Sequence, residues 1–92
     1  MQILQTANFK KIVKKLPVSN KKEVDKVVAY LAKNPEVGQL KKGDLANVAV
    51  YKFHINNQLT LIAYQYDQDA KVITLLALGS HENFYRDLKR ST

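Results

Sequence analysis

The run LLALGSHENFY, residues 75–85, decides how the rest of the chain is interpreted, because it joins an apolar segment to an amphipathic one. Its first half continues the apolar run of residues 72–78, which is typical of an interior β-strand. The break at residues 79–81 predicts a corner between a strand and a helix. Beyond the break, Phe84 and Leu88 have the i, i+4 spacing of one helix face. The stretch therefore predicts a closing strand followed by a short C-terminal helix.

Two predicted strands precede this run, at residues 48–55 and 59–66. The first alternates strictly, so one face would carry Ala49, Tyr51, Phe53 and Ile55 and the other Val50, Lys52 and His54. Asn56-Asn57 suits a tight turn because asparagine tolerates positive φ, and residues 67–69 form a second turn. Together with residues 72–78, these segments predict a three-stranded antiparallel meander.

Two amphipathic helices are predicted in the first half of the chain. Their apolar stripes repeat at helical spacing and consist of Phe9, Ile12, Val13 and Leu16, then Val24, Val27, Val28 and Leu31. Thr6 or Asn8 is the predicted N-cap of the first helix, Ser19 or Asn20 that of the second, and Ser80 that of the last. Pro17 ends the first helix and Asn34-Pro35 the second.

The predicted fold is α+β with the element order βααβββα. Residues 1–5 supply a first strand, the helix hairpin covers one face of an antiparallel sheet, and residues 35–47 form a loop. The 92 residues fit one domain, residues 1–92, of which 46% are hydrophobic.

The composition narrows the class of protein. There is no cysteine, so disulfides and thiolate metal sites are excluded, and no apolar run approaches the length of a membrane span. The first residues lack the features of a signal peptide, and a cytoplasmic protein is expected. Residues 1–42 hold ten lysines against three acids, whereas bases and acids balance in residues 43–92. Such a field attracts polyanions such as RNA, DNA or an acidic protein partner, although lysines can also simply solvate the outer face of two helices.

With this order of elements, the chain resembles the RelE/ParE superfamily of bacterial toxins from type II toxin–antitoxin systems. Three stretches carry the resemblance: Asn34-Pro35 at the end of the helix hairpin, residues 43–53, and residues 75–85. The resemblance implies the small RelE-like fold and a cognate antitoxin. RelE-like members act at the ribosome and cut mRNA, whereas ParE-like members inhibit DNA gyrase without catalysis.

For the RelE-like alternative, the resemblance implies metal-free RNA cleavage by attack of the ribose 2′-OH. His81 is the predicted general base or acid, since the ordinary pKa of a histidine side chain lies near neutrality. Tyr85 resembles the family's C-terminal tyrosine, and Lys52 the basic residue that neutralises phosphate charge. Each has a plainer interpretation: a helix-capping histidine, a packing tyrosine and a solvated lysine.

Four further residues are predicted to bind RNA: Lys41, Lys42, His54 and Arg86. The sequence predicts no cofactor and no metal site, because two histidines 27 residues apart are a poor ligand pair. It departs from the arginine-rich RelE pattern, since its only arginines are Arg86 and Arg90. This favours a histidine-centred reaction and keeps the gyrase inhibitor as the alternative.

Overall fold

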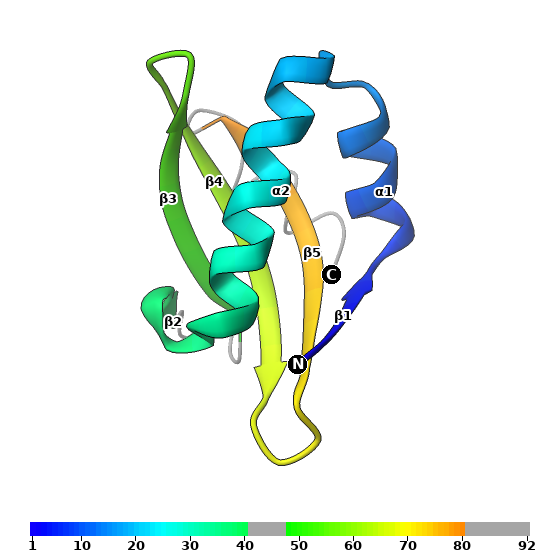
Figure 1. The fold of residues 1–92 in the computed structure, drawn as a ribbon, viewed down its shortest axis with the longest axis vertical. Coiled ribbons are helices and arrows are strands. Elements are labelled where there is room, and N and C mark those ends of the chain that lie inside the picture. The colour runs from blue at the N-terminus through cyan, green and yellow to red at the C-terminus, as the bar shows by residue number, and fades with distance from the viewer. Residues whose placement is uncertain (41–47, 81–92) are drawn as a thin grey trace.

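The computed structural model describes residues 1–40 and 48–80. Within these ranges, two helices lie on one face of a mixed five-stranded sheet, which confirms the α+β class (Figure 1). The elements are β1 (Gln2–Gln5), α1 (Ala7–Lys14), α2 (Val18–Lys33), a 3₁₀ helix η1 (Pro35–Val37), β2 (Gln39–Leu40), β3 (Ala49–Ile55), β4 (Gln58–Asp67) and β5 (Val72–Ser80).

Strands β3, β4 and β5 form the predicted antiparallel meander. Asn56 and Asn57 have φ values of 51° and 66°. The β3–β4 turn therefore has the positive φ for which asparagine was predicted to be suited. The turn between β4 and β5 is closed by Asp67, whose Oδ1 accepts from the backbone N–H groups of Asp69 and Ala70. The periodicity of the sequence therefore predicted the meander correctly.

Strand β1 pairs with β5 in parallel, from Gln2 opposite Val72 to Gln5 opposite Leu75. The sheet order is β1-β5-β4-β3-β2, so β5 is an interior strand, as its apolar run indicated, while β4 occupies the middle. The parallel strand makes the sheet mixed, whereas the sequence predicted an antiparallel one. The predicted loop at residues 35–47 also holds regular structure, namely η1 and β2.

A β-bulge at Leu76 connects the sheet to α1. Ala63 pairs with Ala77 and Tyr64 with Leu75, which leaves Leu76 as the extra residue of β5. Its carbonyl oxygen accepts from Thr6 Oγ1 and from Asn8 Nδ2, each at 3.1 Å. The Thr6 side chain also accepts from the Phe9 N–H at 3.1 Å, as the predicted N-cap of α1.

The main core lies between the helices and the sheet. Phe9, Val24 and Leu31 are buried from the helix side, and Ile62, Tyr64, Ile73 and Leu75 from the sheet side. A second buried cluster, which includes Leu61, Ala63 and Ala77, lies on the opposite face. Within the described ranges, no helix is both long and apolar enough to span a membrane.

Two predicted boundaries are wrong. Helix α2 begins at Val18 with Pro17 as its N-cap, and no side chain caps it, so neither Ser19 nor Asn20 has that role. Proline is tolerated at the N-cap because this residue is extended, with φ −57° and ψ 154°, and its missing N–H removes no helical hydrogen bond. Gly79 and Ser80 continue β5 and pair with Leu61 and Thr60, so they do not form the corner. The helix predicted after Ser80 lies outside the described residues.

Candidate nucleic-acid interface

Lys52 and His54 lie on β3 with exposed side chains, and both belong to the sheet face that points away from the helices. Alternation along the strand explains their position, because Tyr51 and Phe53 between them pack against the main core. The structure therefore brings these two predicted residues together on one face. No acidic side chain of the described ranges forms an ion pair with Lys52.

The register of the sheet relates Lys52 to the end of β5. Lys52 pairs with Leu61 on β4, and Leu61 pairs with Gly79 on β5. Two strand spacings separate Lys52 from Gly79, or about 10 Å. Ser80 lies in the next row, with Thr60 and Phe53. The described chain thus ends at Ser80 beside the row that contains Lys52, and His81 follows in the sequence.

Five predicted site residues lie outside the described residues: Lys41, Lys42, His81, Tyr85 and Arg86. Their predicted roles stay predictions. In residues 1–40 and 48–80, no group of three His, Asp or Glu side chains is arranged to hold a metal ion.

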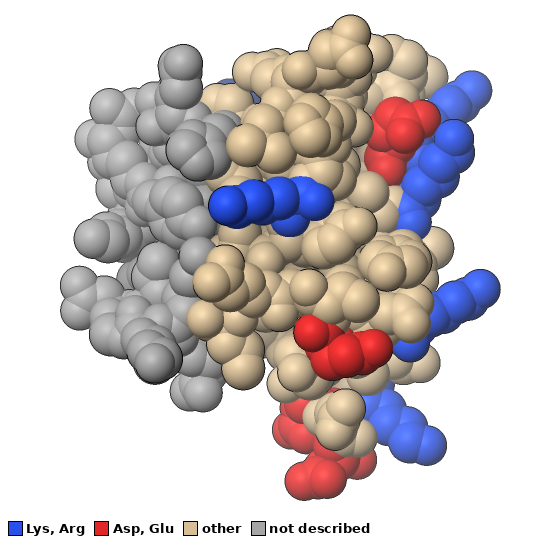
Figure 2. Space-filling model, turned by 90° about the vertical axis from the view of Figure 1, so that its left-hand side faces the viewer, with Lys and Arg blue, Asp and Glu red and all other residues tan. Residues whose placement is uncertain are grey.

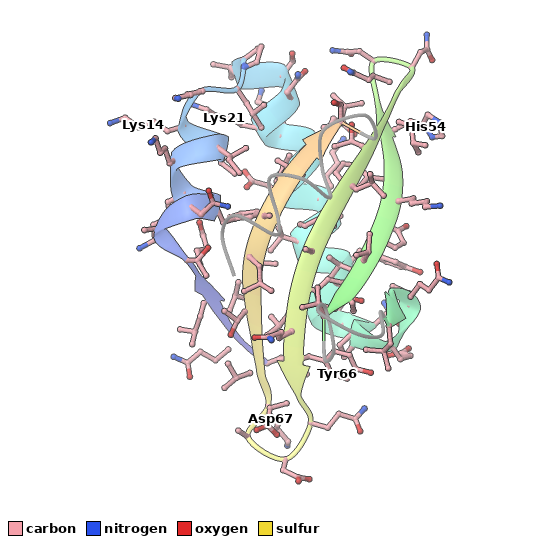
Figure 3. All side chains as sticks on the ribbon, turned by 180° about the vertical axis from the view of Figure 1, so that it is seen from behind. Lys14, Lys21, His54, Tyr66 and Asp67 are labelled. Atoms are coloured by element: carbon pink, nitrogen blue, oxygen red, sulfur yellow. The ribbon has the colours of Figure 1, made fainter. Side chains whose placement is uncertain are left out.

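Most of the positive charge of the described chain lies on the helices. Between Ala7 and Lys33 the sequence has eight lysines and two acids. Figure 2 shows basic side chains standing out along the side where the helices lie. Lys14 and Lys21 reach outward from the helix layer at the end of the molecule where His54 lies on the sheet (Figure 3). One ion pair occurs among the described residues, Lys26 Nζ to Glu23 Oε1 at 3.3 Å. This basic surface is suited to a polyanion.

A small cavity of about 120 Å³ lies at the same end, between the helices and the sheet. Apolar side chains of both layers form its walls, including Ile12, Leu16, Ile55 and Leu78, and Gly79 and Ser80 border it. The end of β5 therefore lies between this cavity and the row that contains Lys52.

Tyr64 on β4 holds the segment that follows α2, and the sequence did not predict this role. Its side chain is fully buried, and its hydroxyl donates to the Pro35 carbonyl at 2.7 Å and accepts from the Gly38 N–H at 2.9 Å. Burial raises the pKa of the Tyr64 phenol, while the Gly38 hydrogen bond acts in the opposite direction. A Cβ at Gly38 would lie 2.8 Å from Tyr64 Cζ, so only glycine fits there. The inward position of Tyr64 in the 59–66 alternation was the available signal.

Comparison with known proteins gives one family. Residues 3–89 match the model of the ParE-like toxin of type II bacterial toxin–antitoxin systems. No curated protein matches the chain.

Several solved structures share the fold. The toxin–antitoxin complex RelBE2 of Mycobacterium tuberculosis matches with a TM-score of 0.76 and 17% identity, over 87% of this chain and 96% of that chain. The E. coli toxin RelE, as a double mutant in the free state, matches with a TM-score of 0.74 and 13% identity, over 98% of this chain and 90% of that chain. A conserved hypothetical protein of Helicobacter pylori matches with a TM-score of 0.58 and 23% identity, over 89% of this chain and 96% of that chain.

Proposed function

Because the chain belongs to the ParE-like toxins of type II bacterial toxin–antitoxin systems, we propose that it is a ribosome-dependent mRNA endoribonuclease of the RelE kind. The observation that carries this proposal is the arrangement on the sheet. Lys52 and His54 are exposed on one face of β3, and β5 ends in the neighbouring row, directly before His81 in the sequence. Membership of the family also makes a cognate antitoxin the expected partner, as in the RelBE complexes.

The proposed reaction is a transesterification within the RNA strand. A base removes the proton of the ribose 2′-OH, and the oxygen attacks the adjacent phosphorus. The bond to the 5′-oxygen breaks, an acid protonates that oxygen, and a 2′,3′-cyclic phosphate remains. We assign the proton transfers to His81, the orientation of the ribose or base to Tyr85, and the neutralisation of the phosphorane charge to Lys52.

The remaining residues would hold the RNA. His54 lies two residues from Lys52 on the same face, and we assign it to the next nucleotide of the RNA. Lys41, Lys42 and Arg86 are assigned to backbone phosphates, for which cationic side chains are suited. The lysines of α1 and of the first half of α2 lie on the other side of the sheet, so we assign them to ribosomal RNA rather than to the cleaved strand. Lys33, the last residue of α2, is not assigned to this contact.

The test is a translating extract to which the purified toxin is added, with the 5′ ends of the mRNA mapped. We expect His81→Ala to slow cleavage by about 10²-fold or more, because general acid–base catalysis contributes that much. We expect Lys52→Ala to slow it by on the order of 10²-fold, through loss of charge stabilisation. Lys33→Ala removes the same charge from an exposed position on α2 and is the matched control.

The outcomes separate the assignments. Equal cleavage by wild type and His81→Ala would remove His81 from the mechanism. If Lys52→Ala and Lys33→Ala behave alike, Lys52 is an ordinary surface lysine. An mRNA that stays intact with wild type would refute the nuclease.

Inhibition of DNA gyrase is the second candidate function. It is favoured by the family model, which is ParE-like, and by the scarcity of basic residues on the sheet. Within β3, β4 and β5, Lys52 is the single lysine or arginine. A supercoiling assay distinguishes the two functions, because loss of gyrase activity with intact mRNA favours inhibition.

A further inference from the structure

The cavity of about 120 Å³ between the helices and the sheet has apolar walls on both of these layers. Ile12 and Leu16 line it from the helix layer, and Ile55 and Leu78 line it from the sheet. Ile55 and Leu78 are only 7% and 6% exposed, so the sheet wall is part of the packed core. Two facing apolar walls are suited to a flat ring, whose faces they contact while its edge stays free for hydrogen bonds.

The size of the cavity selects one ring rather than two. An apolar cavity of about 150 Å³ in another protein holds a benzene molecule. The cavity of this protein is slightly smaller than that one. A pyrimidine base has a single six-membered ring, whereas a purine base has a second ring fused to it. The cavity is therefore suited to a pyrimidine and too small for a purine.

Polar side chains line the same cavity, namely Asn20, Gln58, Thr60 and Ser80. Asn20 Oδ1 accepts from Asn56 Nδ2 at 3.0 Å, so the Asn20 side chain has its N–H groups left to donate. Uracil and cytosine share the acceptor that such a donor needs, the carbonyl oxygen O2. The Thr60 hydroxyl donates to the Gln58 carbonyl at 3.2 Å, which leaves its oxygen to accept from an N–H of the base.

The cavity adjoins the row that contains Lys52. Gly79 and Ser80 border it, and Gly79 shares that row with Leu61 and Lys52. Two strand spacings separate Gly79 from Lys52, about 10 Å, which neighbouring nucleotides of one RNA strand can span. Lys52 lies on the outer face of the sheet and the cavity on the helix side, so this strand would cross the end of β5.

The charge near the cavity favours a ligand that carries phosphates. Residues 7–22, which include the helix wall, hold six lysines and no acidic residue. Lys14 and Lys21 reach outward at this end of the molecule (Figure 3). Such a field concentrates nucleic acid around the cavity.

We infer that this cavity binds a pyrimidine base of the mRNA, next to the phosphate whose charge Lys52 neutralises. The inference rests on the proposed function for the RNA and for the role of Lys52. The ring lies between Leu16 and Leu78, Asn20 donates to the carbonyl oxygen O2, and Thr60 accepts from an N–H of the base. Cleavage therefore occurs at a fixed distance from a pyrimidine, and the protein itself imposes this preference.

Uncharged nucleosides test the cavity without the ribosome, by nuclear magnetic resonance of the full-length protein labelled at its leucine and isoleucine methyl groups. We expect uridine and cytidine to shift the signals of Leu16 and Leu78, with dissociation constants on the order of 1 mM. Adenosine should bind at least about tenfold more weakly, because its second ring does not fit. Absence of these shifts with uridine and cytidine overturns the inference, and equal binding of adenosine overturns the choice of a pyrimidine.

Two matched variants test the hydrogen bond to the base. Asn20→Asp keeps the acceptor for Asn56 and removes the N–H donors. Asn57→Asp makes the same change of charge in the adjoining turn, at a residue that does not line the cavity. We expect Asn20→Asp to weaken uridine binding by about tenfold and Asn57→Asp to leave it unchanged. Equal affinities of the two variants would exclude Asn20 from the site.

The mapped mRNA ends test the base preference. We expect wild type to favour a pyrimidine over a purine by about tenfold at one position beside the cut. Leu16→Phe fills the cavity and should abolish this preference, whereas Leu4→Phe makes the same change on β1 and should keep it. No preference in wild type, or a preference that survives Leu16→Phe, overturns the inference while the nuclease stands. Intact mRNA together with the nucleoside shifts would refute the nuclease alone.

Discussion

At the scale of the residue, Tyr64 shows how one side chain fixes a segment of the chain. Its hydroxyl is hydrogen-bonded to Pro35, the first residue of η1, and to Gly38, which follows η1, and thereby holds this segment against β4. We expect Tyr64→Phe to lower the free energy of unfolding by about 1–3 kcal/mol, because the Gly38 N–H loses its partner. Chemical denaturation at neutral pH measures this loss. A change below about 0.5 kcal/mol would show that water replaces the hydroxyl.

The same residue predicts a pH dependence. The pKa of Tyr64 is raised in the folded state above its usual value near 10, so the neutral phenol is favoured by folding. The stability due to Tyr64 is complete below pH 10 and is lost as the pH rises from there through the folded pKa. Wild type should therefore lose stability above pH 10 more steeply than Tyr64→Phe. Parallel curves for the two proteins in alkaline denaturation would contradict this assignment.

Residue patterns predicted part of the site. Alternation along residues 48–55 placed Lys52 and His54 on one face, and the structure confirms that placement. Alternation describes only which side of a strand a residue occupies, so it could not show that Gly79 lies in the row of Lys52. That relation depends on the register between strands, and the bulge at Leu76 shifts the register.

At the scale of the element, Thr6 and Ser19 give a matched comparison of helix caps. Thr6 caps α1 and bonds to the bulge at Leu76, whereas Ser19 caps nothing, although both fitted the sequence rule. We expect Thr6→Ala to lower the free energy of unfolding by about 1–2 kcal/mol, and Ser19→Ala to lower it by less than about 0.5 kcal/mol. Thermal unfolding measures both. A cost at Ser19 equal to that at Thr6 would show that the N-terminus of α2 depends on this serine after all.

The elements that the sequence predicted are those with a strong local period. Helices α1 and α2 each repeat their apolar residues at helical spacing over eight or more positions. The strands of the β3–β5 meander are bounded by turn residues. The sequence also predicted the first strand at residues 1–5, and β1 confirms it, but so short a strand does not encode its direction locally. Strand β2, which has two residues, was not predicted, because it is a strand only through its pairing with β3.

At the scale of the whole molecule, the uneven charge predicts how the proposed binding to ribosomes responds to salt. The excess of lysine on α1 and α2 should release counterions from RNA, so affinity should fall by about tenfold or more between 50 and 200 mM salt. The double variant Lys14→Ala, Lys21→Ala should show a shallower dependence, by about one unit of slope for each lost phosphate contact. Ribosome pelleting at several salt concentrations measures this. An unchanged slope would exclude these lysines from the contact.

The parallel pairing of β1 with β5 also determines when the protein can complete its fold during its own synthesis. The first strand to be made pairs with the last strand described, and the Thr6 side chain bonds to a carbonyl 70 residues further along. A nascent chain therefore has no partner for β1 until nearly all of it has left the ribosome. Contacts so distant in sequence also form slowly. A protein built in this way completes its sheet only late in its own synthesis, once the residues of β5 have emerged to meet β1.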